Sequence, residues 1–279
     1  MPECKTIACV NQKGGVGKSV TSTNLGVGLA RHGKRVLIVD CDSQASQTVS
    51  LGWREDELPV TLATLFERQL ERKPGDPRCD PRDGILHHAE GVDLLPSSIA
   101  LSGLELRMVN ATSREALLRK LLAPLKDEYD FIILDCPPTL GMITVNALAA
   151  ADSLIVPVQP EFLSVVGMTQ LFDSVAEIRE DINPGLKVDG VLITLANMRT
   201  VLARNSVDAI RAAYGGNLRV YPEAIPYSVK VKEASGVGQS IFAYEPGGKA
   251  AAAYESLVKE VLRDARQKGA NNHAARTDR

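Results

Sequence analysis

The sequence lacks any apolar run of about 18 residues, so it predicts no transmembrane helix. It leaves no room for a signal peptide, because the first apolar strand is predicted to begin at Thr6. A strong charge of either sign is missing too, since the formal net charge is −2 over 279 residues. Any DNA site would therefore have to be a local basic patch. These absences predict a cytoplasmic protein.

Paired cysteines at the C-x-x-C spacing are also absent, and the five cysteines are an odd number. Three of them, Cys9, Cys41 and Cys136, lie in or at the ends of apolar runs. Cysteine at such positions behaves as a small buried hydrophobic residue in a reducing compartment. We therefore expect free, buried cysteines.

A glycine-rich stretch follows the first apolar run. Asn11–Val20 reads NQKGGVGKSV, comes directly after the predicted strand Thr6–Val10 and opens a helical segment. Glycines let backbone N–H groups approach phosphate oxygens, and a helix N-terminus favours negative charge. Lys18 is expected to reach the β- and γ-phosphates, and the Ser19 hydroxyl to bind Mg²⁺. The stretch predicts a site for ATP or ADP with Mg²⁺.

This stretch departs from the standard P-loop pattern, G-x-x-x-x-G-K-[ST]. Gln12 stands where the first glycine should be, and an additional lysine, Lys13, precedes the glycines. The residues predicted to surround the nucleotide phosphates are Lys13, Gly14, Gly15, Val16, Gly17, Lys18, Ser19 and Val20.

Strand-like apolar runs alternate with helical patterns along the chain. Further strands are predicted at Arg35–Asp40, Gly91–Leu95, Tyr129–Asp135, Ser153–Pro157 and Leu186–Leu195. This order predicts an α/β fold with a doubly wound, mostly parallel sheet flanked by helices, and ligands at the carboxyl ends of its strands. We expect one domain over residues 1–267, an irregular segment over 222–246 and a polar, disordered tail over 268–279.

Three carboxylates follow predicted strands. Asp135 ends an apolar strand, as a Walker-B aspartate does, and is expected to hold Mg²⁺ mostly through water. Asp40 and Asp42 are two residues apart, so they point the same way on an extended strand. One of the pair can orient the attacking water, and the other can support the Mg²⁺ water shell.

Several motifs in a fixed order resemble the ParA/Soj family of partition ATPases, within the MinD-type group that has a deviant Walker A motif. The motifs are Lys13–Ser19, Val39–Gln44, Ile132–Pro138, Asn146–Asp152, Ile225–Lys230 and Glu233-Ala234. Because they extend from the N-terminus nearly to the last predicted helix, the resemblance covers almost the whole chain. The family's fold is a P-loop NTPase fold, and its reaction is Mg²⁺-dependent ATP hydrolysis.

The resemblance implies roles for individual residues. Lys13 matches the signature lysine that reaches the partner's phosphates across a nucleotide-sandwich dimer, and Lys18 matches the P-loop lysine. Asp42 matches the switch I aspartate that positions water. The metal ligands implied are Ser19 and Asp135, with Asp40 in support. Positions near the adenine are matched by Asn197, Ile225 and Pro226.

Switch I departs from the family pattern. The family usually has D-P-Q-G-N, whereas this chain has Asp42-Ser43-Gln44-Ala45-Ser46. The acid and the glutamine remain, and the replaced proline and glycine are expected to change the flexibility of the switch.

The resemblance also implies partners: a second copy in the presence of ATP, non-specific DNA on the nucleoid, and a ParB-like centromere-binding protein. DNA binding of this kind is directed at phosphates and sensitive to salt. The cations proposed for it are Arg199, Arg204, Arg211, Arg219, Lys230 and Lys232.

Three other function classes remain open. A MinD-like, membrane-associated positioning ATPase would need an amphipathic anchor, and the apolar stripe of the last helix is better explained by core packing. An electron carrier related to the nitrogenase iron protein would need paired cysteines presenting a cluster. A metabolic P-loop ligase or kinase would need an acceptor pocket.

Overall fold

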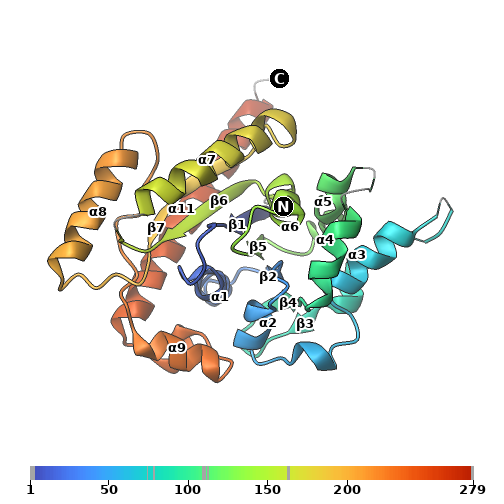
Figure 1. Ribbon diagram of the computed structural model, residues 1–279, viewed down its shortest axis with the longest axis horizontal. Helices are drawn as coiled ribbons and strands as arrows, with labels where there is room; N and C mark the ends of the chain where they lie inside the picture. The colour runs from blue at the N-terminus through green and yellow to red at the C-terminus, as the bar shows by residue number, and fades with distance from the viewer. Residues whose placement is uncertain are drawn as a thin grey trace.

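A computed structural model gives the fold of the chain (Figure 1). It describes the backbone of residues 4–277 except 74, 78, 109–110, 112 and 162–163, and the side chains of the same residues except 165–166 and 268–277. The strands are β1 (Lys5–Cys9), β2 (Val36–Asp40), β3 (Leu86–His87), β4 (Asp93–Leu95), β5 (Phe131–Asp135), β6 (Ser153–Val158) and β7 (Lys187–Ile193). The helices are α1 (Lys18–Arg31), α2 (Ser46–Ser50), α3 (Leu62–Glu71), α4 (Ala100–Met108), α5 (Leu117–Leu122), α6 (Met142–Ala150), α7 (Ser164–Asp181), α8 (Val201–Tyr214), α9 (Val229–Gly236), α10 (Ile241–Tyr244) and α11 (Lys249–Thr277).

The strands form one seven-stranded sheet in the order β3-β4-β2-β5-β1-β6-β7. All neighbouring strands are parallel except β3 and β4. The predicted doubly wound, mostly parallel sheet is confirmed. Because Asp135 of β5 is in register with both Cys9 of β1 and Asp40 of β2, the carboxyl ends of these three strands meet at one edge.

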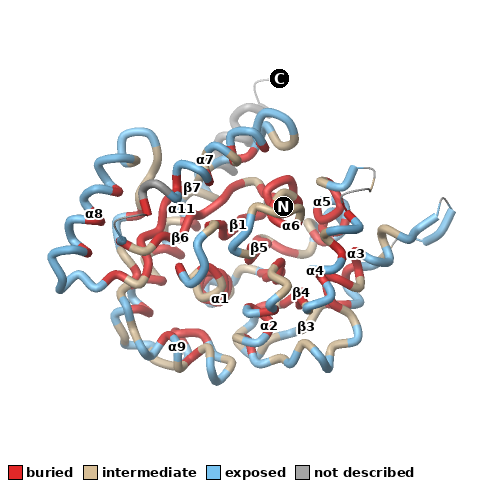
Figure 2. The backbone as a smooth tube through the Cα atoms, in the orientation of Figure 1, coloured by how far each residue is buried: buried red, intermediate tan, exposed pale blue. Residues whose placement is uncertain are grey.

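Hydrophobic side chains cover both faces of the sheet. On one face, strand residues such as Ile133 pack with α1, α10 and α11. On the other, residues such as Ile132 pack with α3 to α8. Figure 2 shows the buried strands between helices whose outer surfaces are exposed. Burial on both faces explains why the strand sequences are apolar without alternation.

Three segments differ from the prediction. The segment 222–246 contains α9 and α10, and the residues after Asp42 contain α2. These helices are too short to show a clear apolar period in the sequence. The expected tail is helical as far as Thr277, because α11 continues beyond Gln267. Extending an existing helix is easier than nucleating one. The side chains of this extension lie outside the described residues, and the single domain over 1–267 remains a prediction.

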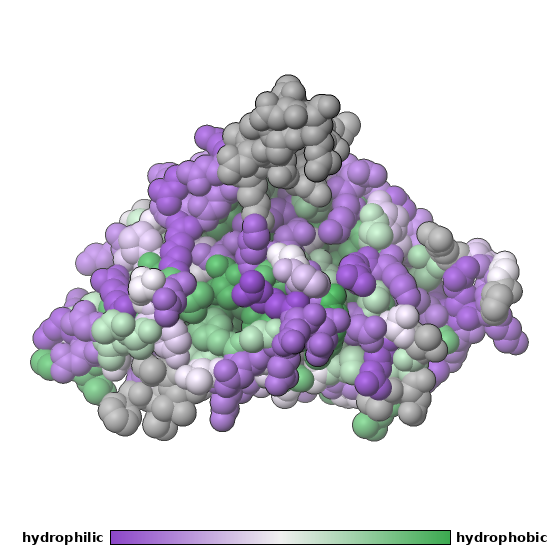
Figure 3. Space-filling view, turned by 90° about the horizontal axis from the view of Figure 1, so that it is seen from above, coloured by the Kyte–Doolittle hydropathy of each residue, from purple (hydrophilic) through white to green (hydrophobic). Residues whose placement is uncertain are grey.

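Polar side chains dominate the face of the molecule drawn in Figure 3. In the view of Figure 3, hydrophilic side chains cover most of the face, and hydrophobic ones gather in a band across its middle. Within the described part of the chain, no helix is both long and apolar enough to cross a bilayer. All five cysteines are free and four are buried, as expected.

Candidate nucleotide and magnesium site

The glycine-rich stretch forms a loop between β1 and α1, at the edge where the strand ends meet. Gly15 and Gly17 have φ angles of 73° and 83°, a left-handed conformation that strains other residues. A Cβ atom on Gly14 or Gly15 would meet nothing within 4 Å, so this side of the loop is open. Backbone N–H groups with open space before them, at a helix N-terminus, form a cradle for phosphate.

Neighbouring strands hold the loop in shape. The Thr194 hydroxyl, after β7, donates a hydrogen bond of 2.7 Å to the carbonyl of Val16. The Asn11 amide donates one of 2.7 Å to the carbonyl of Pro157 in β6. Asn11, Pro157 and Thr194 lie at or just past the carboxyl ends of strands, so the sheet itself fixes the position of the cradle.

Lys18 lies in the interior of this loop. Its side chain is buried, and Nζ donates a hydrogen bond of 3.2 Å to the carbonyl of Lys13. Burial lowers the pKa of Lys18, and the nearby Asp135 carboxylate partly opposes that shift. A buried ammonium group with so few anionic partners gains stability when phosphate oxygens arrive.

Asp135 is fully buried at the end of β5 and faces α1. One carboxylate oxygen, Oδ1, accepts a hydrogen bond of 3.1 Å from the Ser22 hydroxyl. The other, Oδ2, is buried without a hydrogen-bond partner among the described residues. Burial raises the pKa of Asp135, while the nearby Ser19 and Ser22 hydroxyls and the charge of Lys18 oppose the rise.

These oxygens fit a magnesium ion. Mg²⁺ prefers hard oxygen ligands and usually keeps several waters, binding through one or two protein groups and the substrate's phosphates. An orphaned, buried carboxylate oxygen of Asp135 beside the Ser19 hydroxyl meets that requirement. Within the described residues no cluster of three or more His, Cys, Asp or Glu could hold a metal alone.

Asp40 has a different role from the one predicted. Its Oδ2 accepts hydrogen bonds from both the backbone N–H and the hydroxyl of Thr48, at 2.8 and 2.7 Å. Its Oδ1 accepts one of 3.1 Å from the N–H of Asp42. Both oxygens are thus used to anchor α2 and switch I, so we no longer place Asp40 in the metal site. Burial, then the neighbouring Asp135, raises the pKa of Asp40.

Asp42 lies just past β2 and is partly exposed. Its Oδ1 caps the turn by accepting a hydrogen bond of 3.0 Å from the N–H of Gln44. The same turn places Ala45 at φ 50°, in the left-handed region. This explains why the family usually has glycine there, since alanine in this conformation costs about 1 kcal/mol. The role of Asp42 in positioning the attacking water stays a prediction.

Lys13 is exposed at the rim of the loop. Its N–H donates a hydrogen bond of 2.9 Å to the Asn11 side chain, which fixes the backbone. Its ammonium group forms an ion pair with Glu161, after β6. The Lys13 amine therefore lies outside the cradle that Lys18 occupies.

The three residues predicted near the adenine are brought together. Ala196, next to Asn197, forms a bridge with Pro226 and accepts a hydrogen bond from the N–H of Tyr227. Asn197 is exposed and Pro226 partly exposed. The prediction is corrected for Ile225. Its side chain is buried in the hydrophobic core, so this residue supports the site only through its backbone.

The proposed DNA-binding cations do not form one cluster. Arg199 precedes α8 and Arg204 and Arg211 lie on it, whereas Lys230 and Lys232 lie on α9. The prediction is also corrected for Arg219, because two acids bind its guanidinium group. Those acids are Glu260 and Asp264 of α11. A paired, partly buried arginine is not available to phosphate.

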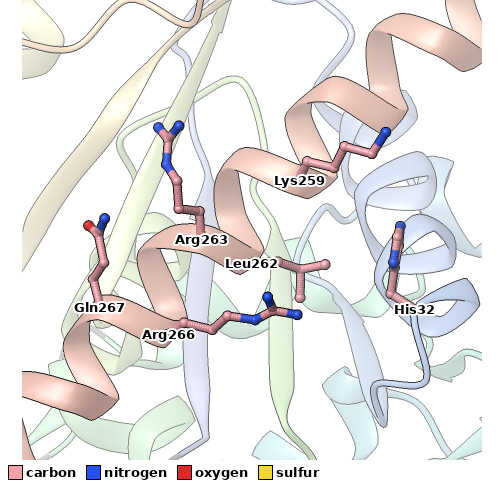
Figure 4. A pocket seen from close by; sticks show the side chains of 6 residues that line it. All are labelled: His32, Lys259, Leu262, Arg263, Arg266 and Gln267. Atoms are coloured by element: carbon pink, nitrogen blue, oxygen red, sulfur yellow. The ribbon is translucent and has the colours of Figure 1, made fainter.

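A cavity lies elsewhere, between the end of α1 and α11 (Figure 4). It has a volume of about 350 Å³ and is lined by His32, Lys259, Leu262, Arg263, Arg266 and Gln267. His32 is at the opposite end of α1 from the P-loop, roughly 20 Å away at 1.5 Å per residue. A second cavity of about 360 Å³ includes Pro226 but no P-loop residue. Neither is the nucleotide cradle, which is an open surface.

Sequence reasoning missed three polar residues that shape the site: Ser22, Glu161 and Thr194. The sequence could have predicted Ser22, because it comes three residues after Ser19 on a predicted helix and therefore lies on the same face. Glu161 and Thr194 carried no such signal, because their contacts with the loop cross more than a hundred residues of chain.

Comparison with known proteins decides the family. The sequence profile of an AAA domain matches residues 4–188. The sporulation initiation inhibitor protein Soj of Bacillus subtilis is 38% identical over 261 residues, which cover 92% of this chain and 98% of that protein. The chromosome partitioning protein ParA of Myxococcus xanthus is 35% identical, covering 92% and 88%. The chain belongs to the ParA/Soj family of P-loop ATPases.

Solved structures agree with this ParA/Soj fold. A structure named cobyrinic acid a,c-diamide synthase from Mycobacterium smegmatis, with bound ADP and magnesium, has a TM-score of 0.80 at 33% identity and covers 93% of this chain and 94% of that one. The septum site-determining protein MinD of Pyrococcus horikoshii, complexed with Mg-ADP, has a TM-score of 0.72 at 23% identity, covering 92% and 96%. A nucleotide with Mg²⁺ is thus the ligand set of this fold, and the site described above fits it.

Proposed function

We propose that the protein is an ATP-dependent DNA-partitioning ATPase. ATP binding assembles a nucleotide-sandwich homodimer that binds DNA non-specifically. Hydrolysis, stimulated by a ParB-like centromere-binding partner, releases the DNA. This cycle segregates a plasmid, mobile element or chromosome over the nucleoid.

The position of Lys13 carries the proposal. Its ammonium group is exposed and pairs with Glu161 rather than filling the cradle, where Lys18 already lies. A second lysine at the rim has no evident use for its own nucleotide, but it can reach the phosphates of a copy docked face to face. A cation supplied in this way neutralises charge in the transition state, as an arginine finger does.

When bound, Mg²⁺ neutralises charge on the β- and γ-phosphate oxygens. The chain's own residues do the rest. Backbone N–H groups of the P-loop orient the phosphates, Lys18 screens their charge, and Asp42 aligns the attacking water. Asp40 holds α2 in place by accepting a hydrogen bond from Thr48. It also holds the switch I turn by accepting one from the N–H of Asp42.

The decisive experiment measures DNA binding with no nucleotide, with ADP and with ATP, at several salt concentrations. The proposal expects tight binding only with ATP, accompanied by dimerisation, and a steep loss of affinity with salt. DNA affinity that is equal in all three nucleotide states would contradict it.

Two alternatives have some support. The MinD neighbours favour a membrane-positioning ATPase, which would co-sediment with anionic liposomes in an ATP-dependent way. The name of the Mycobacterium smegmatis structures favours an amide synthase, which would need an acceptor pocket beside the P-loop. Neither of the two cavities described above is lined by a P-loop residue. ATP turnover that requires cobyrinic acid and an amide donor would support the synthase instead.

A further inference from the structure

Ser22 joins the P-loop helix to the end of β5. It is fully buried, four residues after Lys18 on α1. Its hydroxyl lies 3.1 Å from the carbonyl oxygen of Lys18 and 3.1 Å from Oδ1 of Asp135. Bonding to the carbonyl one turn back is ordinary for a serine in a helix. The second contact is not, because it directs the hydroxyl toward a buried carboxylate on another element.

The two oxygens of Asp135 are therefore unequal. Oδ1 faces Ser22, whereas Oδ2 is buried with no hydrogen-bond partner among the described residues. Once one oxygen is fixed, the carboxylate can no longer rotate freely about its terminal bond. The unpartnered oxygen is then held in one direction, on the same side of α1 as Ser19.

We propose that Ser22 is a positioning residue for the magnesium site. By holding Oδ1 of Asp135, it keeps Oδ2 directed at the water shell of the metal. The inference rests on the proposed function, since it assumes that Asp135 serves Mg²⁺ beside a bound nucleotide. It adds a residue that touches neither nucleotide nor metal and acts only through Asp135.

A purely structural hydroxyl would need no second partner. Ser22 has a single proton, and the Lys18 carbonyl and Oδ1 of Asp135 share it at the same distance of 3.1 Å. The carboxylate is the stronger acceptor because it carries charge, so the hydroxyl is directed chiefly at Asp135. Thr21 provides a comparison on the same helix, since it is also fully buried but makes no hydrogen bond to Asp135. The two hydroxyls can therefore be separated by experiment.

The test measures the Mg²⁺ concentration at which a fluorescent ADP analogue is half-bound, together with nucleotide affinity in EDTA. Partners that orient a metal ligand are typically worth 10–100-fold in metal affinity. Ser22→Ala is expected to raise the Mg²⁺ midpoint about tenfold while leaving affinity in EDTA unchanged. Ser22→Thr, which keeps the hydroxyl, should restore the midpoint. Thr21→Val is the matched control and should leave it unchanged.

Binding of Mn²⁺ to the ADP complex, followed by electron paramagnetic resonance, gives a second readout that does not depend on turnover. An unchanged midpoint in folded Ser22→Ala would show that Ser22 does not position Asp135, even though nucleotide still binds. If wild-type protein binds nucleotide without any Mg²⁺ dependence, the proposed function fails instead. Should Ser22→Ala not fold, Ser22→Cys keeps a weaker donor. That variant should raise the midpoint by less than tenfold, and no rise would overturn the proposal.

Discussion

Lys13 and Glu161 form an ion pair that links the P-loop to the segment after β6. Both side chains are about half exposed, at 46% and 54%. An exposed pair of this kind contributes at most about 1 kcal/mol, because water already solvates both charges. The pair therefore gives Lys13 a resting position without preventing its transfer to a stronger anion, such as the phosphates of a second copy.

Replacing Lys13 tests this role in the dimer. Lys13→Gln should leave nucleotide affinity of the monomer unchanged and lower ATP turnover by about 100-fold or more, because a trans-acting cation is lost. Dimerisation with ATP, measured by light scattering, should weaken as well. Glu161→Gln is the control, since it removes only the resting partner. Normal turnover by the Lys13 variant would disprove action in trans.

Replacing Lys18 tests the cradle itself. Lys18→Ala should weaken ATP and ADP binding by at least about 100-fold, because charge-assisted hydrogen bonds to phosphate are lost. Thermal stability without nucleotide should not suffer, since the variant no longer buries an ammonium group. Isothermal titration measures the affinity. Tight ATP binding by this variant would refute the P-loop assignment.

Asp42 is predicted to act after binding. Asp42→Ala should slow hydrolysis by about 100-fold, the lower range for loss of a group that acts on the attacking water. ATP binding and dimerisation should persist, so the variant accumulates as an ATP-bound dimer in gel filtration. A variant that turns over at the normal rate would remove Asp42 from the mechanism.

Burial of Asp135 predicts a pH-dependent stability. Burial raises its pKa to about 7 in the folded protein, from an ordinary value of 3.8. Between about pH 4 and 7 the folded state holds a proton that the unfolded state has lost. The free energy of unfolding therefore falls as pH rises through this range. Asp135→Asn mimics the protonated form, so its gain in melting temperature without nucleotide should be larger at pH 8 than at pH 5.5.

At pH 8 the gain should reach a few degrees, because about 1 kcal/mol corresponds to roughly 2–4 °C for a protein of this size. The same variant should lose the Mg²⁺ dependence of nucleotide binding. A gain that is equal at both pH values would show that Asp135 is ionised throughout.

Lys230 tests the DNA surface on α9. It is exposed, forms an ion pair of 2.8 Å with Glu233, one turn along the helix, and lies over the Tyr244 ring. Lys230→Glu should weaken DNA binding about tenfold and reduce its dependence on salt, because contacts with phosphates are lost. ATP-dependent dimerisation should be unchanged.

Lys73→Glu is the matched control for this prediction. It makes the same charge change at an exposed position after α3, on the other side of the molecule from α9 (Figure 1). DNA affinity that is the same for both variants at several salt concentrations would rule out the α9 surface.

Much of the site was predictable because its signals are local. A few residues of sequence are enough to recognise the glycines around Lys18. The same holds for the acid at the end of an apolar strand. The strands were found for the same reason, since burial on both faces demands continuous apolar runs. The roles of Asp40 and Arg219 were mistaken, because their partners lie on other elements and no local pattern records those contacts.

The sequence alone determined the family and the fold and predicted the phosphate-binding residues, because backbone conformation and strand burial constrain residue type locally. Only the tertiary structure decided that both oxygens of Asp40 accept hydrogen bonds, whereas Oδ2 of Asp135 has no partner among the described residues. The register of β1, β2 and β5 brings Asp40 and Asp135 side by side. Thr48 donates to Oδ2 of Asp40, whereas Ser22 binds Oδ1 of Asp135 and leaves its Oδ2 without a partner among the described residues. Hydrogen-bond partners depend on distances between elements, and those distances exist only once the sheet and helices have packed.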